Sequence, residues 1–117
     1  MVKKMYWVTC SKFKSYKDSQ SFIAWFRNEE NMAKYKAALT EGMKLVEIYF
    51  PILETADHDV ETWFEIDNWA VMDKDRVNNK MKSLITELVQ EIGIDIFEWS
   101  KSKALRTLHD VQFVFDA

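Results

Sequence analysis

The order of secondary structure is decided by residues 61–93, which read ETWFEIDNWAVMDKDRVNNKMKSLITELVQEIG. Up to Trp69, large apolar and acidic side chains alternate, which is the pattern of a half-buried strand. A stripe at helical spacing follows, and Gly93 stands where a helix C-terminus favours glycine. The stripe consists of Val77, Met81, Leu84, Ile85, Leu88 and Ile92. The segment therefore predicts a strand and then an amphipathic helix capped at Asp73 or Asp75.

The chain before this segment shows the same order. Residues 4–14 alternate as a strand, and a helix-spaced apolar series then begins after a cap at Asp18 or Ser19. Gly42 is predicted to end that helix. The first half of the chain therefore predicts a strand followed by a helix, as the second half does.

Two further strands complete the order. Residues 45–50 alternate and meet Pro51, which cannot donate a ladder hydrogen bond and therefore favours a sheet edge. A fourth strand is predicted over residues 94–100. The result is an α+β fold of βαββαβ order with an antiparallel four-stranded sheet, and the edge position of the second strand agrees with the ferredoxin-like strand order 4-1-3-2.

Length and composition favour one domain over residues 1–117, with residues 101–117 as a C-terminal extension. The 117 residues include only two glycines and one proline, and 48% are hydrophobic, so a disordered chain is excluded. Cys10 is the only cysteine, which favours a reducing compartment, and no stretch reaches the length of a membrane span. We expect a cytoplasmic protein that binds no membrane.

Charge is distributed unevenly along the chain. Residues 1–44 carry nine Lys/Arg against four Asp/Glu, whereas residues 45–75 carry nine acids and one base. The simpler interpretation is that the two regions fold back on each other and form exposed ion pairs. The alternative is a basic docking surface for an anionic partner.

The two faces of the predicted sheet have different roles. Two helices cover only one face, and the expected lining beneath them is Val46, Ile48, Phe50, Phe64, Ile66, Ile94 and Ile96. The opposite face is then expected to hold Trp7, Tyr49, Trp63, Phe97 and Trp99, together with the acids Glu47, Glu65, Asp67 and Asp95. An exposed aromatic patch of this size is unusual for a soluble monomer, and carboxylates repel a phosphate backbone. We therefore predict a homodimer and no nucleic-acid partner.

Residues 64–72, FEIDNWAVM, resemble the strand-then-helix pattern of one known family. The pattern and the predicted fold are similar to the antibiotic-biosynthesis-monooxygenase-like branch of the dimeric α/β-barrel superfamily, in which a tryptophan closes the third strand. Trp69 stands at that place. The resemblance implies a cofactor-independent oxygenase in which Asp67, Asn68 and Trp69 position the substrate. It does not extend to haem binding, because residues 77–81 carry no histidine.

The ligand expected from these features is a small aromatic or hydrophobic molecule, with no cofactor and no metal. Indole rings and a carboxylate suit such a pocket, and the residues predicted to bind the ligand are Trp7, Trp63, Glu65, Asn79 and Trp99. Glu65 and Asp67 are expected on the same face of the strand. There they either act as an acid–base pair or form salt bridges. His58 lies among acids without calcium or zinc spacing, which favours a solvated hairpin tip.

Two alternatives remain open from the sequence. The βαββαβ order is shared with RNA-recognition modules, but the third strand, at residues 61–66, carries acids and no glycine in place of the basic-glycine-aromatic signature. The second alternative is a protein-interaction or structural module without chemistry, which buries a partner with its sheet face and C-terminal segment. Truncation after Ser100 is expected to abolish assembly of such a module.

Overall fold

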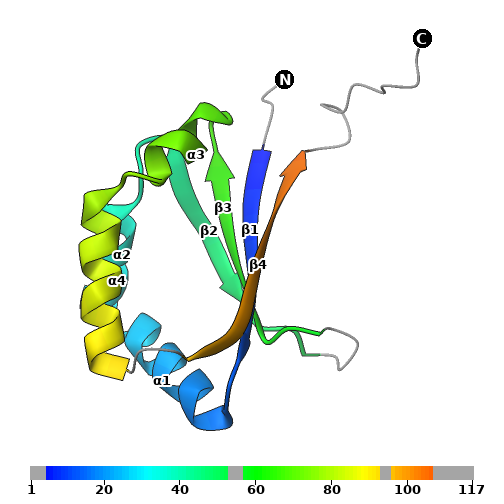
Figure 1. Ribbon diagram of the computed structural model, residues 1–117, viewed down its shortest axis with the longest axis vertical. Coiled ribbons are helices and arrows are strands. Elements are labelled where there is room, and N and C mark those ends of the chain that lie inside the picture. Colours follow the sequence, from blue (N-terminus) through cyan, green and yellow to red (C-terminus); the bar gives the residue numbers. More distant parts are fainter. Residues whose placement is uncertain (1–4, 53–56, 93–95, 107–117) are drawn as a thin grey trace.

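The computed structural model describes residues 5–52, 57–92 and 96–106. Four strands form one antiparallel sheet in the order β2-β3-β1-β4, and the helices lie on one side of it (Figure 1). The elements are β1 (Met5–Phe13), α1 (Tyr16–Arg27), α2 (Glu29–Ala38), β2 (Met43–Tyr49), β3 (Val60–Ile66), α3 (Ala70–Asp75), α4 (Asn79–Ile92) and β4 (Phe97–Arg106). This confirms the α+β ferredoxin-like fold and the edge position of β2.

Each predicted helix is broken once, by an asparagine. Asn28 separates α1 from α2, and its Oδ1 accepts a hydrogen bond from the Asn31 amide at 3.0 Å. α1 itself begins one turn before the predicted caps, because Ser15 Oγ accepts from the Asp18 amide. Asparagine and serine compete for backbone groups and so favour helix starts over helix interiors.

Asn78 plays the same part before α4. Its Oδ1 accepts from the Met81 amide at 3.0 Å, so the predicted caps at Asp73 and Asp75 are wrong. Its Nδ2 donates to the carbonyl of Ala38 at 2.8 Å, which ties the start of α4 to the end of α2. No helix of the described residues has both the length and the apolarity needed to cross a membrane.

Gly42 does not end a helix but forms part of the turn into β2. The amide of Met43 donates to the carbonyl of Thr40 at 3.0 Å, and Gly42 has φ of +89°. A Cβ at this position would lie 2.8 Å from Val71 Cγ2 and 3.1 Å from Asp67 Oδ2. The position therefore requires glycine both for its backbone conformation and for the lack of space.

Replacement of Gly42 by alanine is expected to lower the free energy of unfolding by about 1–3 kcal/mol. The cost arises from the positive φ and from contact with Val71, which is buried and cannot turn away freely. Urea unfolding followed by circular dichroism measures the change. Glu41→Ala, at the exposed neighbouring position, is the control and should stay within about 0.5 kcal/mol of the original protein. Equal stability of the two variants would contradict the prediction.

Strand β4 is longer than predicted and includes residues assigned to the C-terminal extension. It runs over Phe97–Arg106 and pairs with β1 along its length. Truncation after Ser100 would therefore remove half of a sheet strand and would not separate assembly from folding. The spacing of Leu105, Leu108 and Val111 also predicts a helical turn, with a short strand over residues 111–115. Leu105 instead lies in β4, and the rest of that segment lies outside the described residues, as does the predicted start of the fourth strand at residues 94 and 95.

The register of the sheet corrects two predicted side-chain directions. Trp7 pairs with Phe64 and so lies on the face that the helices cover. Phe97 also lies there, because a bulge shifts the pairing of β1 with β4 from Lys12↔Trp99 to Phe13↔Phe97. The Phe97 ring stacks on Phe13, at 5.3 Å between centroids.

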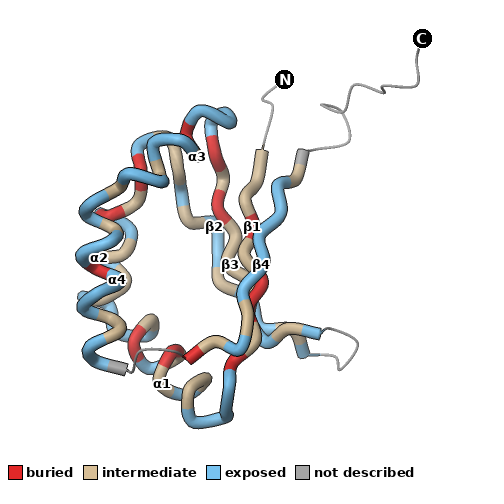
Figure 2. The backbone as a smooth tube through the Cα atoms, in the orientation of Figure 1, coloured by how far each residue is buried: buried red, intermediate tan, exposed pale blue. Residues whose placement is uncertain are grey.

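The core lies between the helices and this face of the sheet. One cluster of buried side chains joins the sheet to α1, and a second joins α1, α2 and α4. The first cluster is Phe13, Phe22, Val60 and Ile96, and the second is Trp25, Ala38 and Leu84. Figure 2 shows buried positions in the strands and on the inward sides of the helices, and exposed positions on the outer side of the helices. Of the predicted stripe of α4, Leu84 is buried, whereas Val77 is 70% exposed.

Candidate functional site

A cavity of about 230 Å³ lies between the helices and the sheet. Its helix side is aromatic and aliphatic, and its sheet side mixes apolar groups with hydroxyls. The helix side consists of Phe22, Phe26, Tyr35, Ile85 and Leu88. The sheet side consists of Thr9, Ser11, Val60, Thr62, Phe64, Phe97 and Ser100. A concave, mainly apolar space with a few polar groups is the usual form of a small-molecule site.

Hydroxyls on this side of the sheet form two rows across β1 and β4. Ser11 Oγ and Ser100 Oγ, both at the cavity, are 2.8 Å apart, and Thr9 Oγ1 lies 3.0 Å from the Oγ of Ser102, an exposed residue outside the cavity lining. Thr62 lies opposite Thr9 in the pairing of β1 with β3. Hydroxyls that pair with each other are tolerated on a covered face, and they keep lone pairs and rotatable protons for a bound molecule. Nothing in the sequence singles out these residues as a site, although alternation along the first strand places Thr9, Ser11 and Phe13 on one face.

The aromatic wall is held in place by ring contacts, of which the Phe26–Tyr35 contact is edge-to-face and the other two are tilted. The ring of Phe26 lies 4.6 Å from Phe22 and 5.1 Å from Tyr35, centroid to centroid, and the second pair is nearly perpendicular. Tyr35 in turn lies 6.4 Å from Phe64 across the cavity. Such contacts fix ring positions, so the cavity is a formed feature of the folded chain.

Burial raises the pKa of the Tyr35 phenol above its ordinary range, and the nearby Asp75 carboxylate adds to the rise. The neutral hydroxyl is therefore the form present at any physiological pH. It offers the cavity one donor and one acceptor beside the hydroxyl rows.

Loss of the Tyr35 phenol should make the protein less sensitive to alkali. Because the pKa in the folded state exceeds the unfolded value of about 10, the neutral phenol stabilises the fold below that pH and the contribution is lost as pH rises above it. We expect the stability of Tyr35→Phe to fall less steeply above pH of about 10 than that of the original protein. Denaturant unfolding at a series of pH values tests this, and parallel curves would contradict it.

The residues predicted to bind a ligand do not come together in the cavity. Trp7 shares its sheet face, but Trp63, Glu65 and Trp99 lie on the opposite face. Asn79 is exposed at the first residue of α4. The structure therefore brings Thr9, Ser11, Thr62 and Tyr35 to the cavity in their place, together with its aromatic wall.

The three residues predicted to be catalytic lie beyond the end of β3 and outside the lining of the cavity. Asp67, Asn68 and Trp69 are all exposed, Trp69 at 43%. Asn68 Oδ1 accepts a hydrogen bond from the Ala70 amide at 2.9 Å, which stabilises the turn into α3. Their catalytic role stays a prediction.

None of the described helices lies on the opposite face of the sheet, and this face is partly aromatic (Figure 1). Trp63 is its centre, with ring centroids 5.7 Å from Tyr6 and 6.1 Å from Tyr49. Val8 lies beside Trp63 in the sheet and is fully buried, whereas Tyr49 is 48% exposed. We refer to this surface, formed by Tyr6, Val8, Tyr49 and Trp63 with the flanking charges, as the open face.

Charges on the open face are unevenly distributed. Glu47, Glu61 and Glu65 lie on β2 and β3, where Lys44 is paired opposite Glu65, while Lys101 and Lys103 lie on β4. The Lys101 ammonium lies 4.8 Å from the centre of the Trp99 ring. At the end of the same sheet, Lys12 pairs at 3.8 Å with Glu98, which lies outside the acidic region 45–75 that was expected to pair with the basic one.

The sequence predicted a solvated hairpin tip at His58, but the structure shows a largely enclosed side chain. Its side chain is only 15% exposed, and both ring nitrogens contact carboxylates. Nδ1 lies 3.2 Å from Asp57 Oδ1 and Nε2 lies 2.6 Å from Glu61 Oε2. The hydrogen bond to Glu61 raises the pKa of His58, while hydrogen bonds from Trp63 and then from His58 lower the pKa of Glu61.

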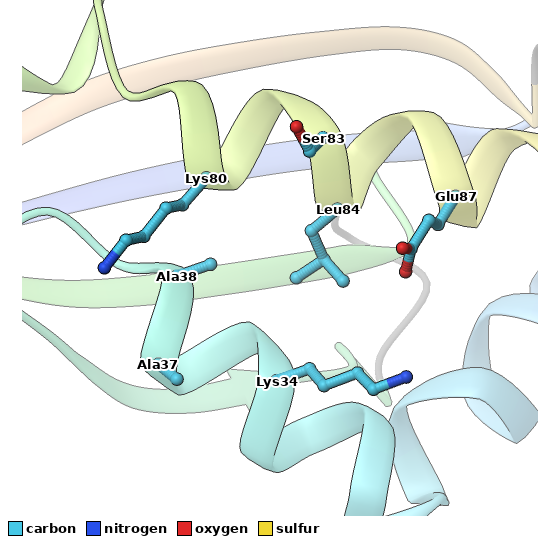
Figure 3. A pocket seen from close by; sticks show the side chains of 7 residues that line it. All are labelled: Lys34, Ala37, Ala38, Lys80, Ser83, Leu84 and Glu87. Carbon is cyan, nitrogen blue, oxygen red and sulfur yellow. The ribbon is translucent and has the colours of Figure 1, made fainter.

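A groove between α2 and α4 is larger but lacks convergent chemistry. Figure 3 shows Leu84 at its centre, with Lys80 toward one end and Lys34 and Glu87 toward the other. Lys80 and Glu87 are exposed, as is Ala37 on the α2 side. Because the two ammonium groups point to opposite ends, they do not converge on a single anion.

Comparison with known proteins identifies the fold. No protein-family model and no curated protein matches the chain. Among solved structures, an uncharacterized NIPSNAP-like domain protein from Burkholderia xenovorans gives a TM-score of 0.64 at 11% identity, over 97% of this chain and 89% of that chain. A Dabb family protein with a ferredoxin-like fold from Mesorhizobium loti gives 0.59 at 11% identity, over 92% and 99%. A dimeric ferredoxin-like protein of unknown function from Thermobifida fusca gives 0.59 at 6% identity, over 90% and 92%.

These similarities confirm, at the level of fold, the predicted resemblance to ferredoxin-like dimeric α/β proteins. They do not single out the monooxygenase-like branch. Identities this low carry no statement about substrate or reaction.

Proposed function

We propose that this protein is a homodimeric small-molecule-binding protein. Each subunit holds a small aromatic or hydrophobic ligand, with one polar group, in the cavity between helices and sheet. The two subunits pack against each other through their open faces. The single observation that carries the binding function is the cavity itself, with its aromatic wall facing paired hydroxyls.

The size of the cavity limits the ligand. An apolar cavity of about 150 Å³ already accepts benzene, and drug-sized ligands occupy about 300 Å³ or more. A volume of about 230 Å³ therefore suits a molecule of one or two rings. The hydroxyls of Thr9, Ser11 and Thr62 favour a phenol, quinone or similar ring compound over a pure hydrocarbon, because a polar ligand atom can replace part of their mutual hydrogen bonding.

The homodimer is supported by the surface left uncovered. Aromatic side chains that no described helix covers favour burial against a second protein surface. In a two-fold dimer each patch meets its counterpart, so the β4 lysines of one subunit can lie over the β2–β3 glutamates of the other. At least one protein of similar fold is described as dimeric.

Catalysis by a cofactor-independent oxygenase is the enzymatic form of this proposal. It rests on the resemblance of residues 64–72 and on Asp67, Asn68 and Trp69, none of which lines the cavity. Binding without turnover is therefore the form that the geometry favours. A module that only contacts other proteins is less favoured, because it gives no reason for a hydroxyl-lined cavity.

The direct test is calorimetric titration with a panel of one- and two-ring compounds that includes phenol, 1-naphthol and 1,4-naphthoquinone. Binding of one molecule per subunit is the expected result, with a rise in melting temperature for the compounds that bind. Oxygen consumption in the same mixtures separates turnover from binding. No binding across the panel would contradict the proposed ligand binding. The proposed homodimer would be unaffected, because it is tested separately.

A further inference from the structure

We propose that Cys10, His58 and Glu61 form a binding site for a divalent transition metal of the zinc type. The Cys10 sulfur, a ring nitrogen of His58 and a carboxylate oxygen of Glu61 lie within 4.8 Å of one another. Sulfur, imidazole nitrogen and carboxylate oxygen are the three donor types that zinc accepts, whereas the sulfur disfavours magnesium and calcium. The sequence predicts no metal, because no second histidine lies near His58 at zinc-binding spacing.

The fold brings the three donors together from distant parts of the chain. Cys10 on β1 lies directly opposite Glu61 on β3, and His58 lies three residues before Glu61. Cys10 is 9% exposed, and the side chains of His58 and Glu61 are 15% and 24% exposed. Partly buried donors of this kind are shielded from solvent but reachable by an ion.

The spacing is close to what a tetrahedral ion requires. Zinc bonds of about 2.0–2.3 Å place neighbouring donor atoms roughly 3.4–3.6 Å apart. The His58 Nε2 to Glu61 Oε2 distance of 2.6 Å would open by about 1 Å on metal binding, because the ion replaces the hydrogen bond. The other donor separations are 4.8 Å or less, so the ion would draw these donors together by about 1 Å at most.

Two outer groups already orient the donors. Asp57 Oδ1 accepts from Nδ1 of His58, which directs Nε2 toward Glu61, and a carboxylate behind a histidine ligand is the usual outer partner in zinc sites. Trp63 Nε1 donates to Glu61 Oε1 at 2.9 Å and leaves Oε2 for the ion. The donor groups therefore have the support that an accidental cluster would lack.

Neighbouring charges and space are compatible with an ion. Lys101 and Lys103 lie on the adjacent strand and oppose a cation, but a thiolate, Glu61 and Asp57 together supply more negative charge than the two lysines offset. A small cavity of about 210 Å³ borders the cluster and is lined by Cys10, Asp57, His58 and Trp99, among others. It leaves room for water as a fourth ligand. All three protein ligands come from one chain, so each subunit carries a complete set of donors, which lies at the edge of the open face.

Cobalt provides the test, because Co²⁺ occupies zinc sites and is coloured. The reduced, chelator-treated protein is titrated with Co²⁺, and we expect one ion per chain, a sulfur-to-cobalt charge-transfer band and the visible bands of tetrahedral cobalt. Added Zn²⁺ should remove both. Cys10→Ser should abolish the charge-transfer band, and His58→Gln should weaken cobalt binding at least 100-fold.

Two variants keep the test decisive if a ligand substitution disturbs folding. Asp57→Asn changes an exposed residue and should weaken cobalt binding about 10–100-fold while circular dichroism stays unchanged. His109→Gln removes the other histidine of the chain and should leave binding unaltered. No cobalt bands with the original protein, or equal affinity in the Asp57 variant, would overturn the proposal.

Discussion

Replacement of Trp63 by lysine is expected to dissociate the proposed homodimer into folded monomers. Trp63 lies at the centre of the open face and contacts both Tyr6 and Tyr49, so it has the position of a hot-spot residue. Loss of a central tryptophan costs about 2–4 kcal/mol of association free energy, and a two-fold dimer loses it twice. We expect the dissociation constant to rise by at least about 1,000-fold.

Lysine is chosen because it is tolerated in the free subunit. Glu65 and Glu61 lie on the same strand face as residue 63 and can pair with the new ammonium, whereas the dimer would have to bury it. Sedimentation equilibrium over a range of concentrations measures the dissociation constant, with circular dichroism as the check on folding. Val77→Lys is the matched control, because Val77 is an exposed apolar residue away from the sheet. An original protein that sediments as a monomer at about 100 μM, or a dimeric Trp63 variant, would contradict the proposed assembly.

The order and edges of the sheet could be predicted from the sequence, but the face on which each side chain lies could not. The alternation of apolar and polar residues correctly placed Phe64 and Trp63 on opposite faces of the sheet, since β3 is regular. It failed where strands bulge: in β2 the pairing shifts between Leu45 and Glu47, so that Leu45 and Ile48 share a face although they differ in parity. The shift that turned Phe97 inward has the same origin, because one extra residue exchanges the faces beyond it.

The candidate sites were missed for a related reason. Thr9, Ser11 and Thr62 look like outward-facing residues when polarity alone is considered, and only the strand register shows that they lie under the helices. Cys10 on β1 and His58, just before β3, are separated in the sequence by α1, α2 and β2. Their proximity therefore follows from the pairing of β1 with β3. The spacing of apolar residues predicts which helices and strands form and how they stack into layers. Which polar side chains lie next to each other depends on the strand register, and the register is set only when the sheet assembles.

Replacement of Thr62 by phenylalanine is expected to abolish ligand binding while preserving the fold. Thr62 lies in β3 on the cavity floor, opposite Thr9, and lines the same cavity as Phe26. Side chains stand roughly perpendicular to a sheet, so a benzyl group at this position would occupy the space proposed for the ligand ring. We expect calorimetry to show at least a 100-fold loss of affinity for any compound that binds the original protein, or about 2.7 kcal/mol.

Stability separates a filled cavity from a damaged core. A ring placed in genuinely vacant space recovers contacts that the cavity walls lack, so the melting temperature of Thr62→Phe should be unchanged or higher, whereas overpacking would lower it. Thr62→Val keeps the volume and removes the hydroxyl, and it should weaken binding of a phenol by about tenfold through one lost hydrogen bond. Thr86→Phe, on the exposed side of α4, is the matched control for added aromatic surface. Undiminished binding in a folded Thr62→Phe variant would place the ligand elsewhere, and the cavity would then be ordinary packing space between helices and sheet.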